Sequence, residues 1–197
     1  MHSSPPRGRP RGFDREAALT DAVRLFWRKG YEAVSVRDLS AALGIGLPSL
    51  YSAFGDKQRL FTESVAFYQR EYGGFIEAAL AEERTAADAI RRILSEAPAR
   101  YTRRSLPPGC LVVHSAVSSD APEIRAMLNR LRAQKIELIC AKMADDMAAG
   151  RLPPTTDSVA IASFVMTVVE GLAERARDGS DQHELARIAD IAAVACP

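Results

Sequence analysis

The residues of this 197-residue chain best suited to chemistry are arginines and small polar side chains near its N-terminus. Arg7, Arg9 and Arg11 lie in a segment rich in Pro and Gly. Guanidinium groups in such an arm pair with phosphates or enter the DNA minor groove. Arg37 can bind a guanine edge through two hydrogen bonds, and Ser49 can bond a base edge or a phosphate. These side chains favour a nucleic-acid-binding function.

A helix-turn-helix pattern over residues 35–57 would position these side chains. Ser35, with an acidic residue three positions later, is typical of a capped helix start, and Gly44 ends that helix. A turn containing glycine leads into a second helix, which ends at Gly55. In such a unit the second helix lies in the DNA major groove. The pattern therefore predicts DNA as the nucleic acid.

The outward face of this second helix is small and sparsely polar. Leu47 and Pro48 can contact a thymine methyl group. The hydroxyl of Tyr51 is placed to reach the DNA backbone. Lys57, in the first turn of the next helix, can share a phosphate with exposed backbone N–H groups. The alternative roles are packing for Tyr51, solvation for Lys57 and a solubilising tail for the arm.

Residues 14–72 resemble the N-terminal domain of TetR-family transcriptional repressors. The resemblance rests on Gly-Tyr before the second helix, Ser-Val-Arg-Asp-Leu, the Leu-Gly-Ile turn, and Leu-Tyr-x-x-Phe-x-x-Lys. It implies a homodimer on a palindromic operator in double-stranded DNA. It also implies DNA-binding roles for seven residues of this segment: Ser35, Arg37, Leu47, Pro48, Ser49, Tyr51 and Lys57.

The chain departs from the family pattern at Ser52-Ala53, where many members carry aromatic residues or His. We therefore expect few direct base contacts. Much of the affinity should come from Tyr51, Lys57 and the arm.

The rest of the chain predicts an all-α fold of nine or ten helices, because no stretch alternates like a strand. Residues 1–12 are expected to form a disordered basic arm. Residues 13–58 form the three-helix DNA-binding domain, and a fourth helix over 56–72 links it to a larger domain over 73–197. Further helices are expected over 75–83, 85–103, 108–120, 122–149, 155–178 and 182–195.

The resemblance implies that the larger domain binds an effector and forms the dimer. Its last two helices carry apolar side chains on more surface than one neighbour covers. We expect them to meet their symmetry mates in an isologous four-helix interface. The alternative is that both helices are core in a monomer. The expected interface residues are Val165, Val169, Leu172, Leu185, Ile188, Ile191 and Ala192.

An effector pocket is expected inside the helices over 85–150 together with 155–170. Its candidate lining residues are Tyr101, Cys110, His114, Met127, Leu131, Phe164 and Met166. No dense Asp/His cluster is present, so we expect an unidentified small-molecule effector, with neither a metal nor a cofactor.

Cys110 offers a second possibility. Its Gly-Cys-Leu context resembles a helix start seen in a subset of these repressors, some of which sense oxidants or electrophiles. The helix dipole favours a thiolate at such a position, and His114 follows four residues later. The alternatives are thus a reactive thiol and a small buried side chain.

Charge and motifs limit the remaining function classes. Residues 1–60 hold ten Lys/Arg against six Asp/Glu, whereas the remainder holds sixteen against nineteen. A basic head suits an electrostatic footprint confined to one end. No G-x-S-x-G, H-E-x-x-H or C-x-x-C motif is present, so we expect a regulator and no enzyme. A helical protein-binding adaptor is a remote alternative.

The chain carries no sign of a membrane or secreted protein. The first twelve residues lack an apolar stretch, and the apolar run Val159–Val169 is too short to span a bilayer. Three scattered cysteines suit neither a disulfide framework nor a zinc site. We expect a cytoplasmic protein with reduced thiols.

Overall fold

The computed structural model describes residues 14–196, and every regular element in this range is helical, as predicted. The arm residues Arg7, Arg9 and Arg11 lie outside the described residues. The helices are α1 (Arg15–Lys29), α2 (Val36–Leu43), α3 (Leu47–Phe54), α4 (Lys57–Tyr68), α5 (Phe75–Glu82), α6 (Ala86–Tyr101), α7 (Leu111–Ser118), α8 (Pro122–Ala148), α9 (Ser158–Arg177) and α10 (Gln182–Val194). A single π-helical turn, η1 (Gln69–Gly73), joins α4 to α5.

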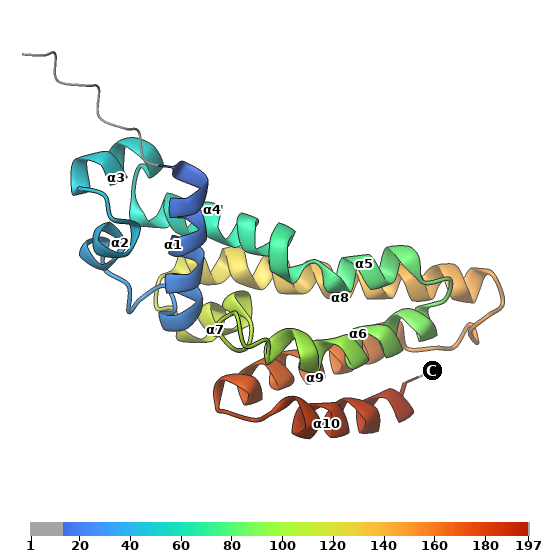
Figure 1. Ribbon diagram of the computed structural model, residues 1–197. Helices are drawn as coiled ribbons and strands as arrows, with labels where there is room; N and C mark the ends of the chain where they lie inside the picture. Colours follow the sequence, from blue (N-terminus) through green and yellow to red (C-terminus); the bar gives the residue numbers. More distant parts are fainter. Residues whose placement is uncertain (1–13, 197) are drawn as a thin grey trace, which may run out of the picture.

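The first three helices form a small unit at one end of the molecule, and α4 leads from it into the long helices of the body (Figure 1). Apolar side chains at helical spacing bury one face of each helix. Phe26 of α1 packs edge-on against Phe61 of α4, with ring centroids 5.0 Å apart. Leu39 of α2 and Leu50 of α3 are fully buried in the same core. The aromatic contact fixes α4 to the N-terminal unit.

The N-terminal core does not end where the expected domain boundary at residue 73 lies. It also contains buried side chains of α7 and the first turns of α8, including Leu111, Ile124 and Leu128. A second core joins α5, α6, α9 and α10 with the later part of α8. Because α7 and the start of α8 pack into the first core, the body and the DNA-binding unit share a continuous apolar contact.

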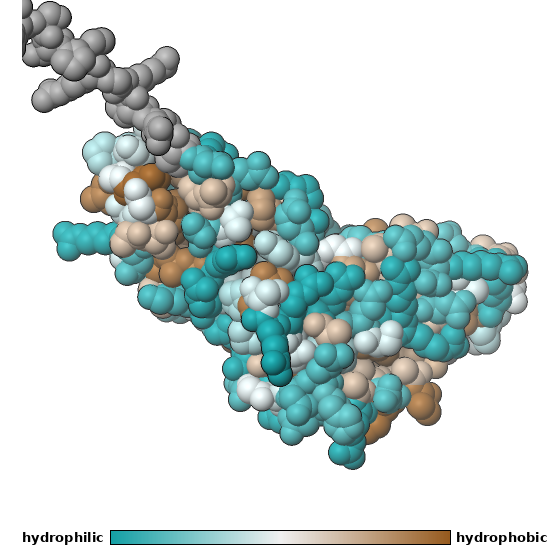
Figure 2. Space-filling view, viewed as in Figure 1, coloured by the Kyte–Doolittle hydropathy of each residue, from teal (hydrophilic) through white to brown (hydrophobic). Residues whose placement is uncertain are grey.

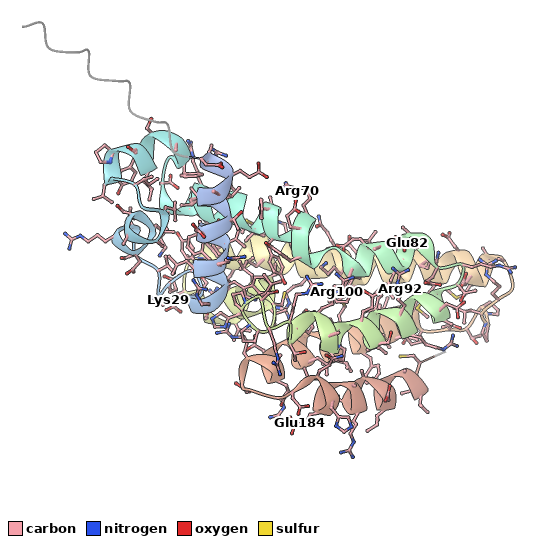
Figure 3. All side chains as sticks on the ribbon, viewed as in Figure 1. Lys29, Arg70, Glu82, Arg92, Arg100 and Glu184 are labelled. Carbon is pink, nitrogen blue, oxygen red and sulfur yellow. The ribbon has the colours of Figure 1, made fainter. Side chains whose placement is uncertain are left out.

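The body packs α8, α9 and α6 side by side, with α5 and α10 on opposite sides (Figure 1). Charged residues reinforce the contact between α5 and α6. Arg92 of α6 lies 2.9 Å from Glu82 and 3.0 Å from Glu83, and these side chains reach across the connection (Figure 3). Arg92 also pairs with Glu96 one turn along α6, at 2.8 Å.

The expected interface on α9 and α10 needs correction. Five of its seven residues are at most 4% exposed and lie in the core of their own protomer: Val165, Val169, Leu172, Leu185 and Ala192. They face inward because α6 covers that side of both helices. Ile188 and Ile191 are 42% and 74% exposed.

Three other apolar side chains of α9 and α10 are also exposed. They are Val159 and Phe164 on α9 and Val194 on α10. We call Val159, Phe164, Ile188, Ile191 and Val194 the apolar strip. In Figure 2, hydrophobic colour gathers over the C-terminal part of α10.

Candidate DNA interface and effector cavity

Capping interactions set the start of α2. The Asp38 N–H donates to Ser35 Oγ at 3.1 Å, and the Ser35 N–H donates to Asp38 Oδ2 at 2.8 Å. The Ser35 hydroxyl also donates to the same carboxylate oxygen at 2.7 Å, and this bond lowers the pKa of Asp38. Ser35 therefore fixes the helix that precedes the turn. Arg37 follows it with an exposed side chain.

The face of α3 that was expected to meet DNA is open to solvent. Leu47 is 38% exposed and Tyr51 is 50% exposed, while Pro48 and Ser49 are also exposed. No side chain caps the N-terminus of α3 at Gly46, so its first N–H groups are available to a phosphate. The structure thus brings together the predicted residues of this helix on one accessible surface.

The back of α3 is held by α1. The Arg15 guanidinium lies 4.6 Å from the centre of the Phe54 ring and contacts Glu63 of α4 at 2.6 Å. This contact links the end of α3 to both neighbouring helices. Arg15 is absent from the sequence-predicted site, because a single arginine in an amphipathic helix gives no sign of its partners.

Lys57 stands at the first position of α4, where it was expected to meet a phosphate. Its ammonium lies 4.1 Å from the centre of the Tyr31 ring, a cation–π contact. Partial burial lowers the pKa of Lys57, and the negative charge of Glu32 acts in the opposite direction. Tyr31 in turn packs edge-on against Phe61, with centroids 4.9 Å apart. The lysine therefore rests on a rigid aromatic support.

Glu32 links this support to the body. Its Oε1 accepts hydrogen bonds from Ser119 Oγ at 2.8 Å and from the N–H groups of Asp120 and Ala121, each at 3.1 Å. The carboxylate thus lies at the N-terminus of α8, where negative charge is favoured. These bonds, that from Ser119 foremost, lower the pKa of Glu32. Sequence reasoning missed this contact, which joins positions far apart in the chain.

A second polar contact holds the end of α1, where Figure 3 labels Lys29. Arg177, the last residue of α9, donates to the Trp27 carbonyl at 3.1 Å and the Arg28 carbonyl at 3.4 Å. Its guanidinium also lies 3.1 Å from His114 Nε2. The pKa of His114 is lowered by burial and by the Arg177 charge, against a hydrogen bond to the Lys29 backbone.

A partly open cavity lies where α4, η1, α5, α6, α7, α8 and α9 meet. The centre of a water-sized sphere can move through about 30 Å³ inside it. The apolar wall consists of Phe75, Ile76, Val112, Val113, Met166 and Val169. The polar wall consists of Tyr68, Gln69, Tyr101, Cys110, Arg132, Lys135 and Glu170, and Gly73 completes the lining.

The cavity contains Tyr101, Cys110 and Met166 of the expected pocket, and the other four candidates lie elsewhere. His114 faces Arg177 and the end of α1, whereas Cys110 occupies the N-cap position of α7. Met127 packs against the N-terminal core, Leu131 lines a separate surface hollow, and Phe164 is 42% exposed.

Within residues 14–196 no cluster of His, Cys, Asp and Glu could hold a metal ion. In the same range, no helix has the length and hydropathy needed to cross a bilayer.

A small helix-turn-helix unit with an exposed second helix, seated on a helical body with an internal cavity, defines a DNA-binding transcriptional regulator. Two family models match the chain. One, described as bacterial regulatory proteins of the tetR family, matches residues 18–63, and a tetracyclin repressor-like C-terminal domain matches residues 86–192. The chain belongs to the TetR family, as the sequence motifs predicted.

Relatives with known names agree with this assignment. The HTH-type transcriptional repressors ComR and BdcR of Escherichia coli are each 32% identical to this chain. The matches cover 93% of the chain and 89% of ComR, and 94% of the chain and 90% of BdcR. A cysteine-substituted form of the TetR family regulator CifR, complexed with a 26-base-pair operator DNA, is 37% identical. The two structures superimpose with a TM-score of 0.89, and the match covers 96% of this chain and all of the CifR chain.

Proposed function

We propose that this repressor binds a palindromic operator as a homodimer and is released when a small molecule occupies the cavity. One observation carries the proposal. The cavity is lined by Tyr68, Gln69 and Gly73, at the end of the helical segment that begins at Lys57 in the DNA-binding unit. A molecule that displaces these residues acts directly on the helix that holds the DNA-binding unit.

The release follows from dimer geometry. The two recognition helices of a dimer must match half-sites about 34–36 Å apart, one turn of DNA. A tilt of α4 in each protomer changes this spacing, so operator and effector favour different states of the dimer. The operator contacts in this proposal are Arg7, Arg9, Arg11, Ser35, Arg37, Leu47, Pro48, Ser49, Tyr51 and Lys57. Because such a regulator acts on the chromosome, we place it in the cytoplasm.

The DNA-binding part is tested by selecting duplexes from a random pool with the full-length protein. We expect the selected sequences to form an inverted repeat, and footprinting to protect both halves. A variant with Arg7, Arg9 and Arg11 changed to Ala should bind more weakly, with a shallower salt dependence. Failure to enrich any sequence would contradict operator recognition.

The release is tested with molecules that raise the melting temperature of the protein. Operator affinity is measured with and without each molecule at saturation. Lower affinity in its presence supports the proposal, whereas unchanged affinity for all of them removes the effector mechanism.

Cys110 supports a second candidate function, that of a thiol-based sensor with the same fold. Cys110 lines the cavity at the N-cap position of α7, so a molecule in the cavity meets a nucleophilic atom. The test is the alkylation rate by iodoacetamide, followed by peptide mapping. We expect Cys110 to react faster than Cys140 and the alkylated protein to lose operator affinity. Equal, slow labelling of both would exclude a sensor role.

A further inference from the structure

The three charged residues that line the cavity are already paired, Arg132 with Glu170 and Lys135 with Glu77, which lies outside the lining. Arg132 Nε donates to Glu170 Oε1 at 2.7 Å, and Lys135 Nζ donates to Glu77 Oε1 at 2.8 Å. A charged ligand would have to separate one of these partly buried pairs or remain unpaired itself. Either event leaves an uncompensated charge out of water, which is unfavourable. The cavity therefore selects against ions of both signs.

The two tyrosines of the cavity differ in their hydrogen bonding. The Tyr68 hydroxyl is hydrogen-bonded to the Cys110 sulfur and accepts a bond from the Leu111 N–H. The Tyr101 side chain is equally enclosed, at 5% exposure, and its ring packs edge-on against Phe75. Among the described residues, however, its hydroxyl has no hydrogen-bond partner, and the oxygen is not fully covered by protein atoms, so it borders free space.

An unpartnered phenol in a buried wall is unfavourable unless something in the cavity bonds to it. Burial also raises the pKa of Tyr101 well above its ordinary value, so the hydroxyl keeps its proton and acts as a donor. The phenol oxygen can also accept a hydrogen bond, but its O–H is satisfied only by an acceptor, and we take an acceptor as the partner.

The remaining wall sets the size and polarity of the partner. Its apolar side chains offer contact to carbon atoms, and an interior that leaves the centre of a water-sized sphere about 30 Å³ restricts a ligand to a small molecule. Met166 in this wall has a flexible, unbranched side chain that can adapt to a slightly larger one.

We propose that the cavity binds a small, uncharged, mainly apolar molecule through one oxygen atom that accepts the hydrogen bond of Tyr101. Resting on the proposed function, this assignment names the chemical class of effector at that site. A ketone is the simplest member of the class.

Four probes of nearly equal shape test the assignment on the full-length protein. Butan-2-one carries the acceptor, and 2-methylbut-1-ene replaces its oxygen with a methylene group. Propionate and sec-butylammonium add a negative and a positive charge. Dissociation constants are measured by NMR titration. We expect butan-2-one to bind more tightly than the other three.

Tyr101→Phe removes the hydroxyl and keeps the ring. It should weaken butan-2-one binding about fivefold, the usual effect of one neutral hydrogen bond, and leave the alkene unaffected. Tyr72→Phe is the matched control, because Tyr72 does not line the cavity, and it should bind butan-2-one like the wild type. Equal binding of butan-2-one by Tyr101→Phe and the wild type would overturn the assignment.

If Tyr101→Phe does not fold, the order of the four dissociation constants measured on the wild type tests the assignment instead. A charged probe that binds as tightly as butan-2-one overturns the assignment, as does an alkene that equals the ketone. Operator affinity, measured separately, distinguishes the two proposals. Binding that depends on Tyr101 without loss of operator affinity supports the ligand class and contradicts release. If a molecule releases the operator but binds equally well to Tyr101→Phe and the wild type, the result supports release and contradicts the ligand class.

Discussion

At the scale of single residues, Lys57 combines an electrostatic role with a defined position. Its ammonium lies over the Tyr31 ring, and Lys57 stands in the first turn of α4, where backbone N–H groups lack partners within the helix. The contact limits the freedom of a side chain that otherwise loses entropy when it binds a phosphate. Because its side chain is held in place before DNA binds, Lys57 should contribute more to operator affinity than a freely mobile lysine of the same charge.

We predict that Lys57→Gln weakens operator binding about 3- to 10-fold at moderate salt and lowers the salt slope by about one per bound protomer. The reason is the loss of one phosphate contact that releases a counterion. Gel-shift titrations at several salt concentrations measure both effects. Arg84→Gln removes a charge from the exposed connection between α5 and α6, away from α3 and α4, and should change neither.

His114 predicts a specific dependence of stability on pH. Its pKa in the folded protein lies below the ordinary value of 6.5, because burial and Arg177 disfavour the protonated ring. Between pH 6.5 and the lower pKa of His114 in the folded protein, the unfolded chain therefore binds more protons than the native one. The free energy of unfolding should fall as pH drops through this window, and the loss should level off below the folded pKa.

Denaturant unfolding of wild type and His114→Gln between pH 8 and about pH 5 tests this. The variant should be less sensitive to pH in the window. His183→Gln alters an exposed imidazole at the start of α10 and should retain the wild-type profile. Identical profiles for all three proteins would contradict the assignment to His114.

At the scale of helices, the sequence predicted most elements, because glycines and capping residues act on their immediate neighbours in the chain. The glycines after α1, α2 and α3 have positive φ, which ends those helices where expected. The start of α7 differs, since it begins at Leu111 and not at residue 108. Gly109 lies against the α9 backbone, where a Cβ would come within 2.5 Å of the Ala173 carbonyl. No local pattern reveals that contact.

Arg177 shows how one helix completes another. The last carbonyls of α1 have no partner within their own helix, and this guanidinium supplies one from the end of α9. We predict that Arg177→Met lowers the free energy of unfolding by about 1–2 kcal/mol, since it leaves the Trp27 carbonyl without its donor. Arg175→Met, two residues earlier and exposed, should stay within about 0.5 kcal/mol of wild type. Urea unfolding compares them.

At the scale of the whole molecule, an amphipathic pattern shows that one face of a helix is buried. It does not show whether the same protomer or a partner covers that face. On α9 the inward Val165 and Val169 and the outward Phe164 are all apolar, so the sequence does not separate protomer core from partner surface. The cavity shows the same limit. Tyr101 and Cys110 were predicted to line it, whereas Tyr68 and Arg132 come from helices whose relative placement no local signal gives.

The apolar strip yields the last prediction. Its five side chains are exposed in the protomer, and a dimer that joins α9 and α10 with their symmetry mates would cover them. Ile191→Glu places a charge at the strip, so we predict dissociation to monomers at micromolar concentration. Light scattering after gel filtration measures this, and operator affinity should fall because one protomer contacts only one half-site.

Val117→Glu is the matched control. Val117 on α7 is 74% exposed, as is Ile191, and it lies outside the apolar strip. Its replacement by Glu therefore adds a charge at an equally exposed apolar side chain that belongs to neither α9 nor α10. We expect this variant to stay dimeric. If both variants remain dimers, the interface lies elsewhere. If both dissociate, charge at any exposed apolar site is enough, and the strip has no special role in assembly.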